Sequence, residues 1–544
     1  MSLTLHVDGR PVAVPDDGSS LLEVLRDRLG VRSAKDGCSP QGQCGCCTVL
    51  VDGQPRVACV TPARRVAGRA ITTFEGLAEP TRRRWTEAFA ATGASQCGFC
   101  TPGILVRLAA ANGGETLDEG TITRALLAHL CRCTGWRSIV DAATALPPGQ
   151  PGRDFEAAER RASLEGHSPQ RVGAAVAAGH AGFADDLAPD AALVAVPDGR
   201  AGWAVAESLS EARAAAGRVP GRRSGTALRH PLDLPPGDWE VTLRTTWVEP
   251  AYVESDASWC VPGGEPATPL ANGGAFGAKV DSPAPAVARR LANQYHRPVR
   301  VLLSREDVVR LGPKRPPIAA GIRADGTGVV RVARTPGIAA AIRSAAPGLE
   351  VQEVDVVGPP TSVSLRAAGW AEGAILEAAA AVAGGRRRSV LPAAAGAGSE
   401  NSRSAEVTVA SSWGSQATAE VSVDAEGRPR GVRIRVACGD PLDEVVLRSY
   451  CIGAVHMALG WVCSEGLAVD DAGQPQDLTI RSFGILRAVD TPPIEVGIEA
   501  NGGRAVNGSD AVFAATAAAA WIAQGLPPEW PTIRGIIASR NLAR

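Results

Sequence analysis

The alternation of apolar and polar residues near the N-terminus predicts two β-hairpins. Residues 3–7 and 11–14 alternate on either side of an Asp-Gly pair, and residues 48–51 and 56–59 flank a second Asp-Gly pair. An Asp-Gly pair between two alternating runs is typical of a tight two-residue hairpin turn. We therefore expect the chain to begin with antiparallel strands.

Between and after these hairpins, the spacing of the apolar residues becomes that of a helix. Ser20 and Glu23 have the spacing of a capping box ahead of a leucine-rich run, and Gly30 ends that run, so residues 20–29 are predicted to form a helix. After the second hairpin, apolar residues recur at helical spacing in four short runs. We expect a bundle of four short helices over residues 78–147.

The rest of the chain contains both strand-like and helical patterns of apolar residues. Residues 148–171 are rich in proline, glycine and charge, which predicts a linker. Residues 172–544 alternate strand-like and alanine-rich helical runs. The expected strands are 239–247, 299–304, 406–410, 419–424 and 431–437, and the expected helices are 284–296, 371–383 and 511–524. Together these patterns predict an α+β multidomain protein.

Nine of the thirteen cysteines lie in the first 133 residues, which is enough thiolate for two four-cysteine metal sites. The first group reads C-x5-C-x2-C-x11-C, close to the spacing that holds a [2Fe–2S] cluster in plant-type ferredoxins, and it makes a β-grasp ferredoxin domain plausible for residues 1–77. The second group reads C-x2-C and then C-x-C. The groups are Cys38, Cys44, Cys46, Cys47 and Cys59, and Cys97, Cys100, Cys131 and Cys133.

Disulfide bonds and a zinc site are the alternatives for these cysteines. Disulfides are disfavoured because the chain is 544 residues long and its start lacks an apolar signal region, which also leads us to expect a cytoplasmic protein. Zinc is the stronger rival, because paired C-x2-C units are common zinc ligands. The glycine-rich loop GCSPQGQCGCCTV favours iron, because its small residues allow backbone N–H groups close to a cluster.

Composition excludes several other functions. The chain has 56 basic and 57 acidic residues, so its charge predicts no nucleic-acid or anionic-membrane partner, and no apolar run is long enough to predict a membrane span. The seven histidines show no paired spacing, so we infer no separate zinc site. Four further cysteines are interpreted as buried and inert: Cys260, Cys438, Cys451 and Cys463.

The cysteine motifs resemble those of the xanthine oxidase or molybdenum hydroxylase family. GCSPQGQCGCCTVLVDG is similar to the first cluster motif of that family, and QCGFCTPG with LCRCTG is similar to the second. The resemblance implies two [2Fe–2S] clusters, one held by Cys38, Cys44, Cys47 and Cys59 and the other by Cys97, Cys100, Cys131 and Cys133. Five residues instead of the usual four separate the first two cysteines. Together with the extra Cys46, this leaves the choice among Cys44, Cys46 and Cys47 open.

Residues 172–544 resemble an abbreviated molybdopterin-binding large subunit of the same family. The matching segments are AAGHAGFADDL, GGAFGAK, SLRAAGW, residues 454–496 and residues 507–520. The resemblance implies molybdopterin contacts at Gly273, Gly274, Phe276, Gly277 and Arg366. The intervening segments are short, and the region expected to carry a glutamine near the metal is missing. Whether this chain binds molybdopterin therefore stays open.

Asp510 occupies the place of the family's catalytic glutamate, and the resemblance implies a general base there. Its side chain is one methylene shorter, which matters because catalytic geometry tolerates displacements of about 1 Å at most. The alternative is an N-cap, because Ser509 and Asp510 precede an alanine-rich run. For the glycines predicted to contact molybdopterin, the alternative is a turn that needs glycine for steric reasons alone. For Arg366, the alternative is a surface arginine.

The resemblance implies an iron–sulfur electron-transfer subunit of a molybdenum hydroxylase complex. Electrons would pass from a molybdenum centre toward a flavin, with a complete molybdopterin-binding subunit and an FAD-binding subunit as partners and the C-terminal half as a scaffold. One alternative is a compact hydroxylase that oxidises an aldehyde or N-heterocycle with Asp510 as base. Another is a non-enzymatic redox-sensing interaction protein.

Overall fold

The computed structural model describes residues 2–112, 115–217, 225–385, 391–392 and 402–534. Five strands near the N-terminus form one mixed sheet in the order β2-β1-β5-β3-β4. Their bounds are β1 (Ser2–Val7), β2 (Arg10–Pro15), β3 (Thr48–Val51), β4 (Gln54–Val57) and β5 (Ala70–Thr72). The pairs β1–β2 and β3–β4 are antiparallel, so both predicted hairpins are confirmed.

The predicted helix after the first hairpin is present, and its last turn is wider than expected. Ser20 and Glu23 form the capping box at α1 (Leu21–Glu23), and the chain continues as a π-helical turn, η1 (Val24–Arg28). Arg26 in this wider turn is 5% exposed and donates hydrogen bonds to a backbone carbonyl and to two carboxylates of a later segment. This turn therefore joins the N-terminal sheet domain to the rest of the chain.

The four predicted short helices follow the sheet. They are α2 (Glu79–Thr92), α3 (Thr101–Asn112), α4 (Glu119–Ala125) and α5 (Arg137–Ala145), and η2 (Ala58–Val60), η3 (Ala63–Val66) and η4 (Leu126–Ala128) are 3-10 turns. Helix α2 packs against α5, and α3 packs against the β3–β4 hairpin. The bundle and the sheet therefore share one apolar core.

The segment predicted as a linker contains a helix, α6 (Phe155–Gly166). Asp154 caps it, and Arg161 is fully buried. Arg161 bonds to Glu165 at 2.9 Å and to the carbonyls of Pro441 and Val506 at 2.9 and 2.8 Å. Composition alone could not predict this helix, because its stability depends on partners about 280 to 345 positions away in the chain.

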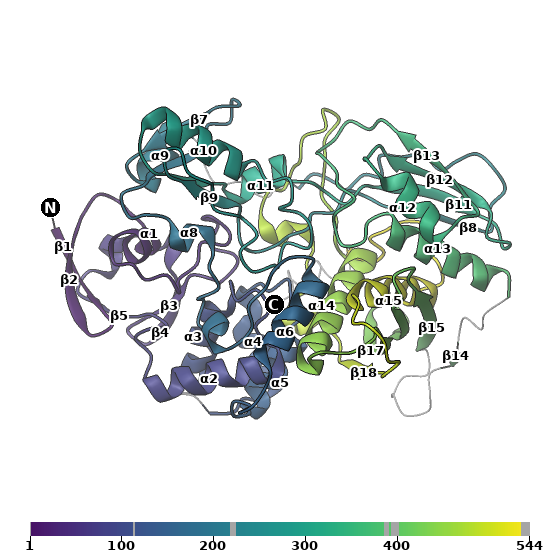
Figure 1. Ribbon diagram of the computed structural model, residues 1–544, viewed down its shortest axis with the longest axis horizontal. Coiled ribbons are helices and arrows are strands. Elements are labelled where there is room, and N and C mark those ends of the chain that lie inside the picture. Colours follow the sequence, from purple (N-terminus) through teal and green to yellow (C-terminus); the bar gives the residue numbers. More distant parts are fainter. Residues whose placement is uncertain (1, 113–114, 218–224, 386–390, 393–401, 535–544) are drawn as a thin grey trace.

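Two four-stranded sheets form the upper lobes in Figure 1. One has the order β7-β6-β10-β9 and the other β13-β12-β11-β8. The first contains β6 (Leu193–Pro197), β7 (Trp203–Ala206), β9 (Ala257–Cys260) and β10 (Val299–Leu302), with α8 (Ala184–Leu187), α9 (Leu209–Ala216), α10 (Ala284–Tyr295) and α11 (Arg305–Leu311) around it, whereas α7 (Ala174–Ala177) packs against α2. The second contains β8 (Val241–Arg244), β11 (Ile318–Ile322), β12 (Gly328–Ala333) and β13 (Leu349–Val354), with α12 (Ile338–Ala345) and α13 (Trp370–Ala383).

The C-terminal part has a five-stranded sheet, β14-β15-β16-β17-β18, covered by two long apolar helices. Its elements are β14 (Leu391–Pro392), β15 (Arg403–Ala410), β16 (Gln416–Val423), β17 (Pro429–Ala437), α14 (Glu444–Cys463), η5 (Ile480–Phe483), η6 (Ala488–Asp490), β18 (Ile494–Ile498) and α15 (Ser509–Ala523). Helix α14 is long and apolar enough to cross a membrane by length and composition, and 89% of that window is buried inside the protein. Such burial is typical of a core helix.

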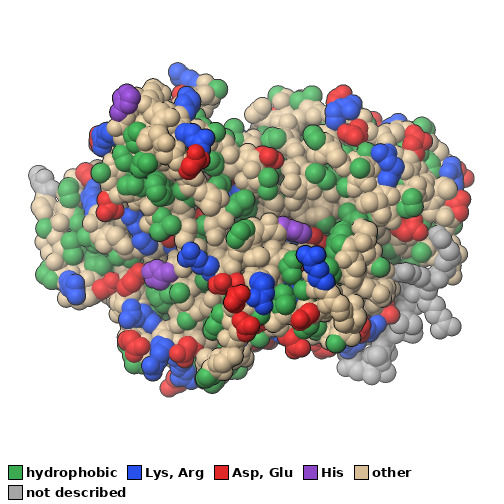
Figure 2. Space-filling view, in the orientation of Figure 1, with side chains coloured by type: hydrophobic (Ala, Val, Ile, Leu, Met, Phe, Trp, Pro, Cys, Tyr) green, Lys and Arg blue, Asp and Glu red, His purple; other side chains and the backbone are tan. Residues whose placement is uncertain are grey.

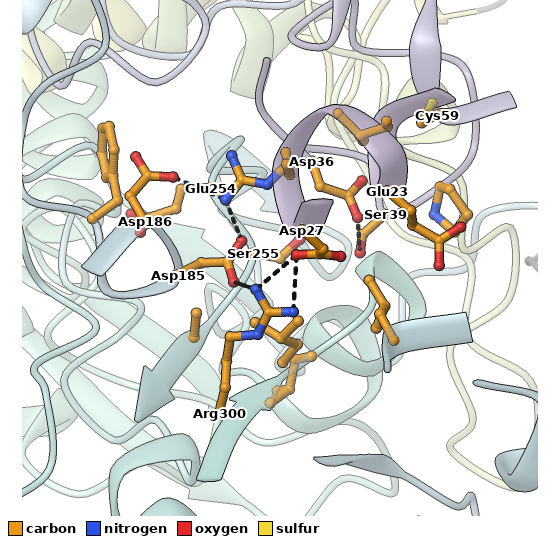
Figure 3. Close-up of a pocket in the computed structure, with 18 of the residues that line it drawn as sticks. Glu23, Asp27, Asp36, Ser39, Cys59, Asp185, Asp186, Glu254, Ser255 and Arg300 are labelled. Atoms are coloured by element: carbon orange, nitrogen blue, oxygen red, sulfur yellow. Dashed lines mark hydrogen bonds and ion pairs between the residues drawn. The ribbon is translucent and has the colours of Figure 1, made fainter. Parts of the chain in front are cut away.

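Charged pairs join the N-terminal sheet domain to the lobe of β10. Arg300 on β10 reaches Asp27 at 3.1 Å and Asp185 at 3.2 Å, as Figure 3 shows. Arg26 bonds to Asp185 at 2.6 Å and to Asp186 at 2.9 Å. These groups surround a cavity of about 40 Å³. Because partly buried charges are costly unless paired, this network favours one relative position of the two domains.

On the face shown in Figure 2, acidic and basic side chains lie interspersed rather than gathered by sign. This distribution agrees with the near-zero net charge of the chain. A nucleic-acid surface typically gathers basic residues on one face.

Candidate functional site

The four thiols predicted for the first cluster lie together. The Cys38 thiol is in hydrogen-bonding contact with those of Cys44 and Cys59, and the Cys59 thiol is in contact with that of Cys47. All four side chains are at most 5% exposed. Backbone N–H groups of Gln43 and Cys59 donate to the sulfurs of Cys38 and Cys47, both at 3.4 Å. N–H groups that point at cysteine sulfur stabilise negative charge on a cluster.

Local structure and a distant arginine hold this first loop. Cys47 immediately precedes β3 and Cys59 follows β4, so the hairpin fixes both. Arg305 at the start of α11 is fully buried and donates to the carbonyls of Gly37 and Val253, both at 2.8 Å. The loop is therefore positioned by its own hairpin and by the lobe of α11.

The four thiols predicted for the second cluster form two close pairs. The sulfurs of Cys97 and Cys133 are 3.6 Å apart, and the thiols of Cys100 and Cys131 are in hydrogen-bonding contact. Cys97 and Cys100 lie just before α3, whereas Cys131 and Cys133 lie between η4 and α5. The hydroxyl of Thr134 lies 3.1 Å from the Cys131 sulfur. Two loops of the bundle, one before α3 and one before α5, thus meet at one buried site.

Cys46 lies between the two sets of thiols. Its thiol contacts Cys44, and it interacts electrostatically with Cys100 and Cys131 of the second set. Cys44 and Cys47, by contrast, contact Cys38 and Cys59 directly. This arrangement favours Cys44 and Cys47 as ligands and leaves Cys46 beside them.

The two loops also touch through their backbones. The N–H of Leu130 donates to the carbonyl of Cys44 at 3.0 Å, which joins the residue before Cys131 to the first set. A Cβ on Gly103 would lie 2.5 Å from the carbonyl oxygen of Gly45, so only glycine permits this approach of α3. The two sets are therefore neighbours whose loops are joined by this backbone hydrogen bond.

Helix α14 lies directly on the second set. A Cβ on Gly453 would be 1.9 Å from the carbonyl oxygen of Cys133. Gln96 donates from its amide nitrogen to that same carbonyl at 3.0 Å and to the hydroxyl of Ser449 at 2.9 Å. The C-terminal half therefore excludes water from the second set, a factor that affects cluster potential.

The donor sets fit two iron–sulfur clusters. Within the described ranges, no three His, Cys, Asp or Glu side chains converge as they would on a single metal ion. A [2Fe–2S] cluster has four thiolate ligands distributed over two irons, so its ligands need not converge on one point. Two separate sets of four buried thiols match that requirement. Assignment of the eight cysteines as ligands remains a prediction.

The residues predicted to contact molybdopterin do not line one common cavity. Phe276 and Arg366 border a cavity of about 50 Å³, whereas Gly277 borders an open cleft of about 1030 Å³. A Cβ on Gly274 would lie 3.0 Å from the Cys97 sulfur, and one on Gly273 would lie 2.4 Å from the Gln170 amide nitrogen. The glycine loop is filled by the protein's own groups, so this arrangement does not fit an organic cofactor held by all five residues.

Asp510 lies in the first turn of α15 and is paired with the histidine that immediately follows α6. Its Oδ2 is 3.0 Å from Nε2 of His167, its Oδ1 has no hydrogen-bond partner among the described residues, and the side chain is only 3% exposed. The N-cap interpretation is wrong, because the helix begins at Ser509 and Asp510 is inside it. The Asn507 side chain instead accepts from the Asp510 N–H at 3.0 Å. Asp510 borders the larger cleft.

Replacement of Asp510 by asparagine is expected to lower the pKa of His167. The hydrogen bond from His167 to Asp510 raises that pKa above its ordinary value near 6.5, because the carboxylate stabilises the imidazolium. The stabilisation is complete below pH 6.5 and is lost as pH rises through the raised pKa. A histidine NMR titration of wild type and variant checks this, with His6 as an internal reference. An unchanged His167 titration would contradict the pairing.

The four remaining cysteines are all buried. Burial raises the pKa of Cys438 to about 11 and that of Cys463 to about 12. Because the thiolate is the reactive form, these raised values keep both groups protonated and unreactive near neutral pH.

Sequence reasoning missed three side chains around these sites. His167 carries no local signal, because its partner is 343 positions away. Glu465 forms a buried bidentate pair with Arg132 at 2.5 and 2.7 Å, equally without a local signal. Asn507, by contrast, had a local sequence signal. It stands three residues before Asp510, whose N–H donates to the Asn507 side chain, and this is the spacing of a helix cap.

Comparisons with known proteins agree with the thiol geometry. Residues 5–68 match a family described as a 2Fe-2S iron-sulfur cluster binding domain, and residues 73–144 match a [2Fe-2S] binding domain. The xanthine dehydrogenase iron-sulfur-binding subunit of Escherichia coli O157:H7 is 42% identical over 148 residues, which cover 26% of this chain and 91% of that subunit. Both cysteine groups lie in the matched domains.

Longer relatives match over a small part of their length. A xanthine dehydrogenase of Blastobotrys adeninivorans is 36% identical over 165 residues, which are 28% of this chain and only 12% of that protein. The fold extends the likeness: the crystal structure of the aldehyde oxidoreductase of Desulfovibrio desulfuricans superposes with a TM-score of 0.72 at 15% identity, over 99% of both chains. The chain therefore belongs to the molybdenum hydroxylase family of oxidoreductases, which includes xanthine dehydrogenase and its iron–sulfur subunits.

Proposed function

We propose that this protein is the iron–sulfur electron-transfer subunit of a cytoplasmic molybdenum hydroxylase complex. Its two thiol sets would each hold a [2Fe–2S] cluster, and these clusters supply one-electron transfer when bound. Electrons would come from a molybdenum centre on a partner subunit and leave toward a flavin on another. The C-terminal half would be the scaffold on which the catalytic partner docks.

The observation that carries this proposal is the hydrogen bond between the two sets. The Leu130 N–H donates to the Cys44 carbonyl at 3.0 Å, so a route of covalent bonds and one hydrogen bond leads from the first set to Cys131. Both sets are buried, which suits electron transfer without side reactions. The residues of this chain thus bind the clusters, exclude water and connect them.

Protein atoms occupy the space around the glycine loop. This supports the proposal that the molybdenum centre lies on a partner subunit. Gly274 packs against Cys97, and a Cβ on Gly277 would lie 1.8 Å from the carbonyl oxygen of Ser364. The Tyr450 hydroxyl donates to the Gln170 side chain beside Gly273. These contacts occupy the space next to the second set with protein atoms.

The proposed domains follow the same division. Residues 1–77 would be the β-grasp domain, residues 78–147 the helical-bundle domain, residues 148–171 the connection, and residues 172–544 the scaffold. The connection includes α6, whose Arg161 is bound to carbonyls of the C-terminal half. The scaffold is therefore expected to stay attached to the cluster domains.

Protein purified anaerobically should contain about four irons per chain and no stoichiometric molybdenum or pterin. Iron, molybdenum and pterin are measured on the chain alone and with co-purifying proteins, and dithionite reduction is followed by EPR, where two signals are expected. Molybdenum that appears only with a partner supports the proposal. One molybdenum per isolated chain, with turnover of an aldehyde, would contradict it. Reversible iron loss that alters partner binding would favour a redox sensor instead.

A compact hydroxylase is the second candidate, and one observation favours it. Asp510 borders the cleft of about 1030 Å³, and its Oδ1 has no partner among the described residues. A free carboxylate oxygen at a cleft is suited to general-base chemistry. The molybdenum content of the isolated chain separates the two candidates.

A further inference from the structure

Arg366 is a buried arginine that has no counter-charge among the residues that the structure describes. Its side chain is 6% exposed, and its Nε and Nη2 have no hydrogen-bond partner within the described part of the chain. No carboxylate of the described residues lies within ion-pair distance of it. Its guanidinium lies over the ring of Phe276 at 5.1 Å and near that of Phe513 at 5.8 Å. An unpaired buried charge is costly, so such an arginine is expected to have a partner.

The other charges around Arg366 are already paired. Three ion pairs border or flank the same cavity: Arg132 with Glu465 at 2.5 Å, Arg315 with Glu372 at 2.8 Å, and Lys314 with Glu249 at 2.9 Å. Each pair is neutral as a whole. The cavity wall therefore carries an excess of one positive charge, which is that of Arg366.

Asp510 does not neutralise this charge directly. Its carboxylate interacts with Arg366 electrostatically, but its Oδ2 is bonded to His167 at 3.0 Å, so the nearby imidazole shares that negative charge. Burial lowers the pKa of Arg366 because it removes the guanidinium from water, whereas the charges of Asp510 and Glu165 act in the opposite direction without bonding to it. The guanidinium is left with two free donors.

The cavity at Arg366 has a defined size. It measures about 50 Å³ and is lined by Phe276, Phe513, Trp461 and Met457 besides the charged groups. One water takes about 10 to 15 Å³ by this measure, so the cavity has room for a small ion and none for an organic cofactor. The one unpaired positive charge in the cavity wall can be neutralised by an anion with one negative charge.

We propose that the cavity at Arg366 binds one small monovalent anion, such as nitrate, formate or chloride. The free Nε and Nη2 lie on one edge of the guanidinium, the edge that binds planar oxyanions with two hydrogen bonds. The aromatic rings exclude water and strengthen that attraction. The site is independent of the proposed electron transfer, because none of its wall residues is a predicted cluster ligand.

The test is an anion exchange at constant ionic strength. Sodium gluconate, whose anion is too large for the cavity, is replaced stepwise by sodium nitrate, and the unfolding temperature of the holoprotein is recorded by tryptophan fluorescence. Binding to the folded state alone should raise this temperature saturably, by about 2 °C or more once nitrate is well above its dissociation constant.

Two variants make the test specific. Arg366→Met removes the charge and should abolish the saturable shift, whereas Arg343→Met, on an exposed position of α12, should retain it. Because Arg366→Met removes an unpaired buried charge, it should not lower the unfolding temperature in gluconate. Equal nitrate shifts in wild type and Arg366→Met, or no saturable shift in wild type, would overturn the proposal. Iron content is measured in parallel, because it tests the electron-transfer proposal independently of anion binding.

Discussion

Replacement of Cys131 by alanine is expected to remove one cluster and leave the other in place. Cys131 is 2% exposed, and its thiol contacts that of Cys100. A [2Fe–2S] cluster is held by four thiolates, so a cluster that loses one of them is exposed to loss of its iron. Iron should fall from about four to about two per chain, with one of two EPR signals lost.

Two matched controls define this effect. Cys451→Ala changes a fully buried thiol on α14 that belongs to neither set, so iron should stay at about four. Cys46→Ala should also retain all iron, because Cys46 lies beside the predicted ligands rather than among them. Loss of two irons in Cys46→Ala would show that Cys46 is a ligand. If Cys131→Ala kept all of its iron, Cys131 would not be a ligand and the predicted second cluster site would be contradicted.

Replacement of Glu465 by glutamine should destabilise the protein strongly. Arg132 donates to both oxygens of Glu465, at 2.5 and 2.7 Å, and the two side chains are only 5% and 2% exposed. Removing one charge leaves the other buried and unpaired, which costs about 3 to 5 kcal/mol. Arg132 stands between Cys131 and Cys133, so iron of the second set should be released at lower urea concentration.

The measurement is urea unfolding followed by circular dichroism and by the visible absorbance of the clusters. Glu156→Gln is the control, because its pair with Arg160 is exposed, with side chains 85% and 51% accessible, and such pairs contribute about 0.5 kcal/mol or less. The double variant Arg132→Met with Glu465→Leu should recover much of the loss, since it leaves no unpaired charge. A Glu465→Gln midpoint equal to that of Glu156→Gln would contradict the argument.

Local patterns predicted most elements of the fold. Both hairpins followed from alternation around Asp-Gly pairs, and helices α10, α13 and α15 lie within a few residues of the alanine-rich runs. These elements are encoded locally, because turn chemistry and periodicity act over a few residues. The segment 148–171, predicted as a linker, instead contains α6, which is held by long-range contacts of Arg161, and the sequence patterns also did not single out the long helix α14.

Cysteine spacing located the thiol sets in advance, although spacing alone did not place Cys46. Its position between the sets depends on the meeting of two loops, which the contact of Leu130 with Cys44 brings together. Spacing along the chain fixes which thiols reach a common loop, whereas the approach of a second loop is a property of the packed bundle.

The sequence by itself determined the hairpins, the bundle and two groups of four cysteines, because each depends on residues close together in the chain. Only the tertiary structure decided that His167 pairs with Asp510, that the glycine loop packs on Cys97, and that Arg366 is left without a counter-charge. The physical reason is that pairing and desolvation of charge depend on groups hundreds of positions apart, whose meeting is set by the packing of whole domains.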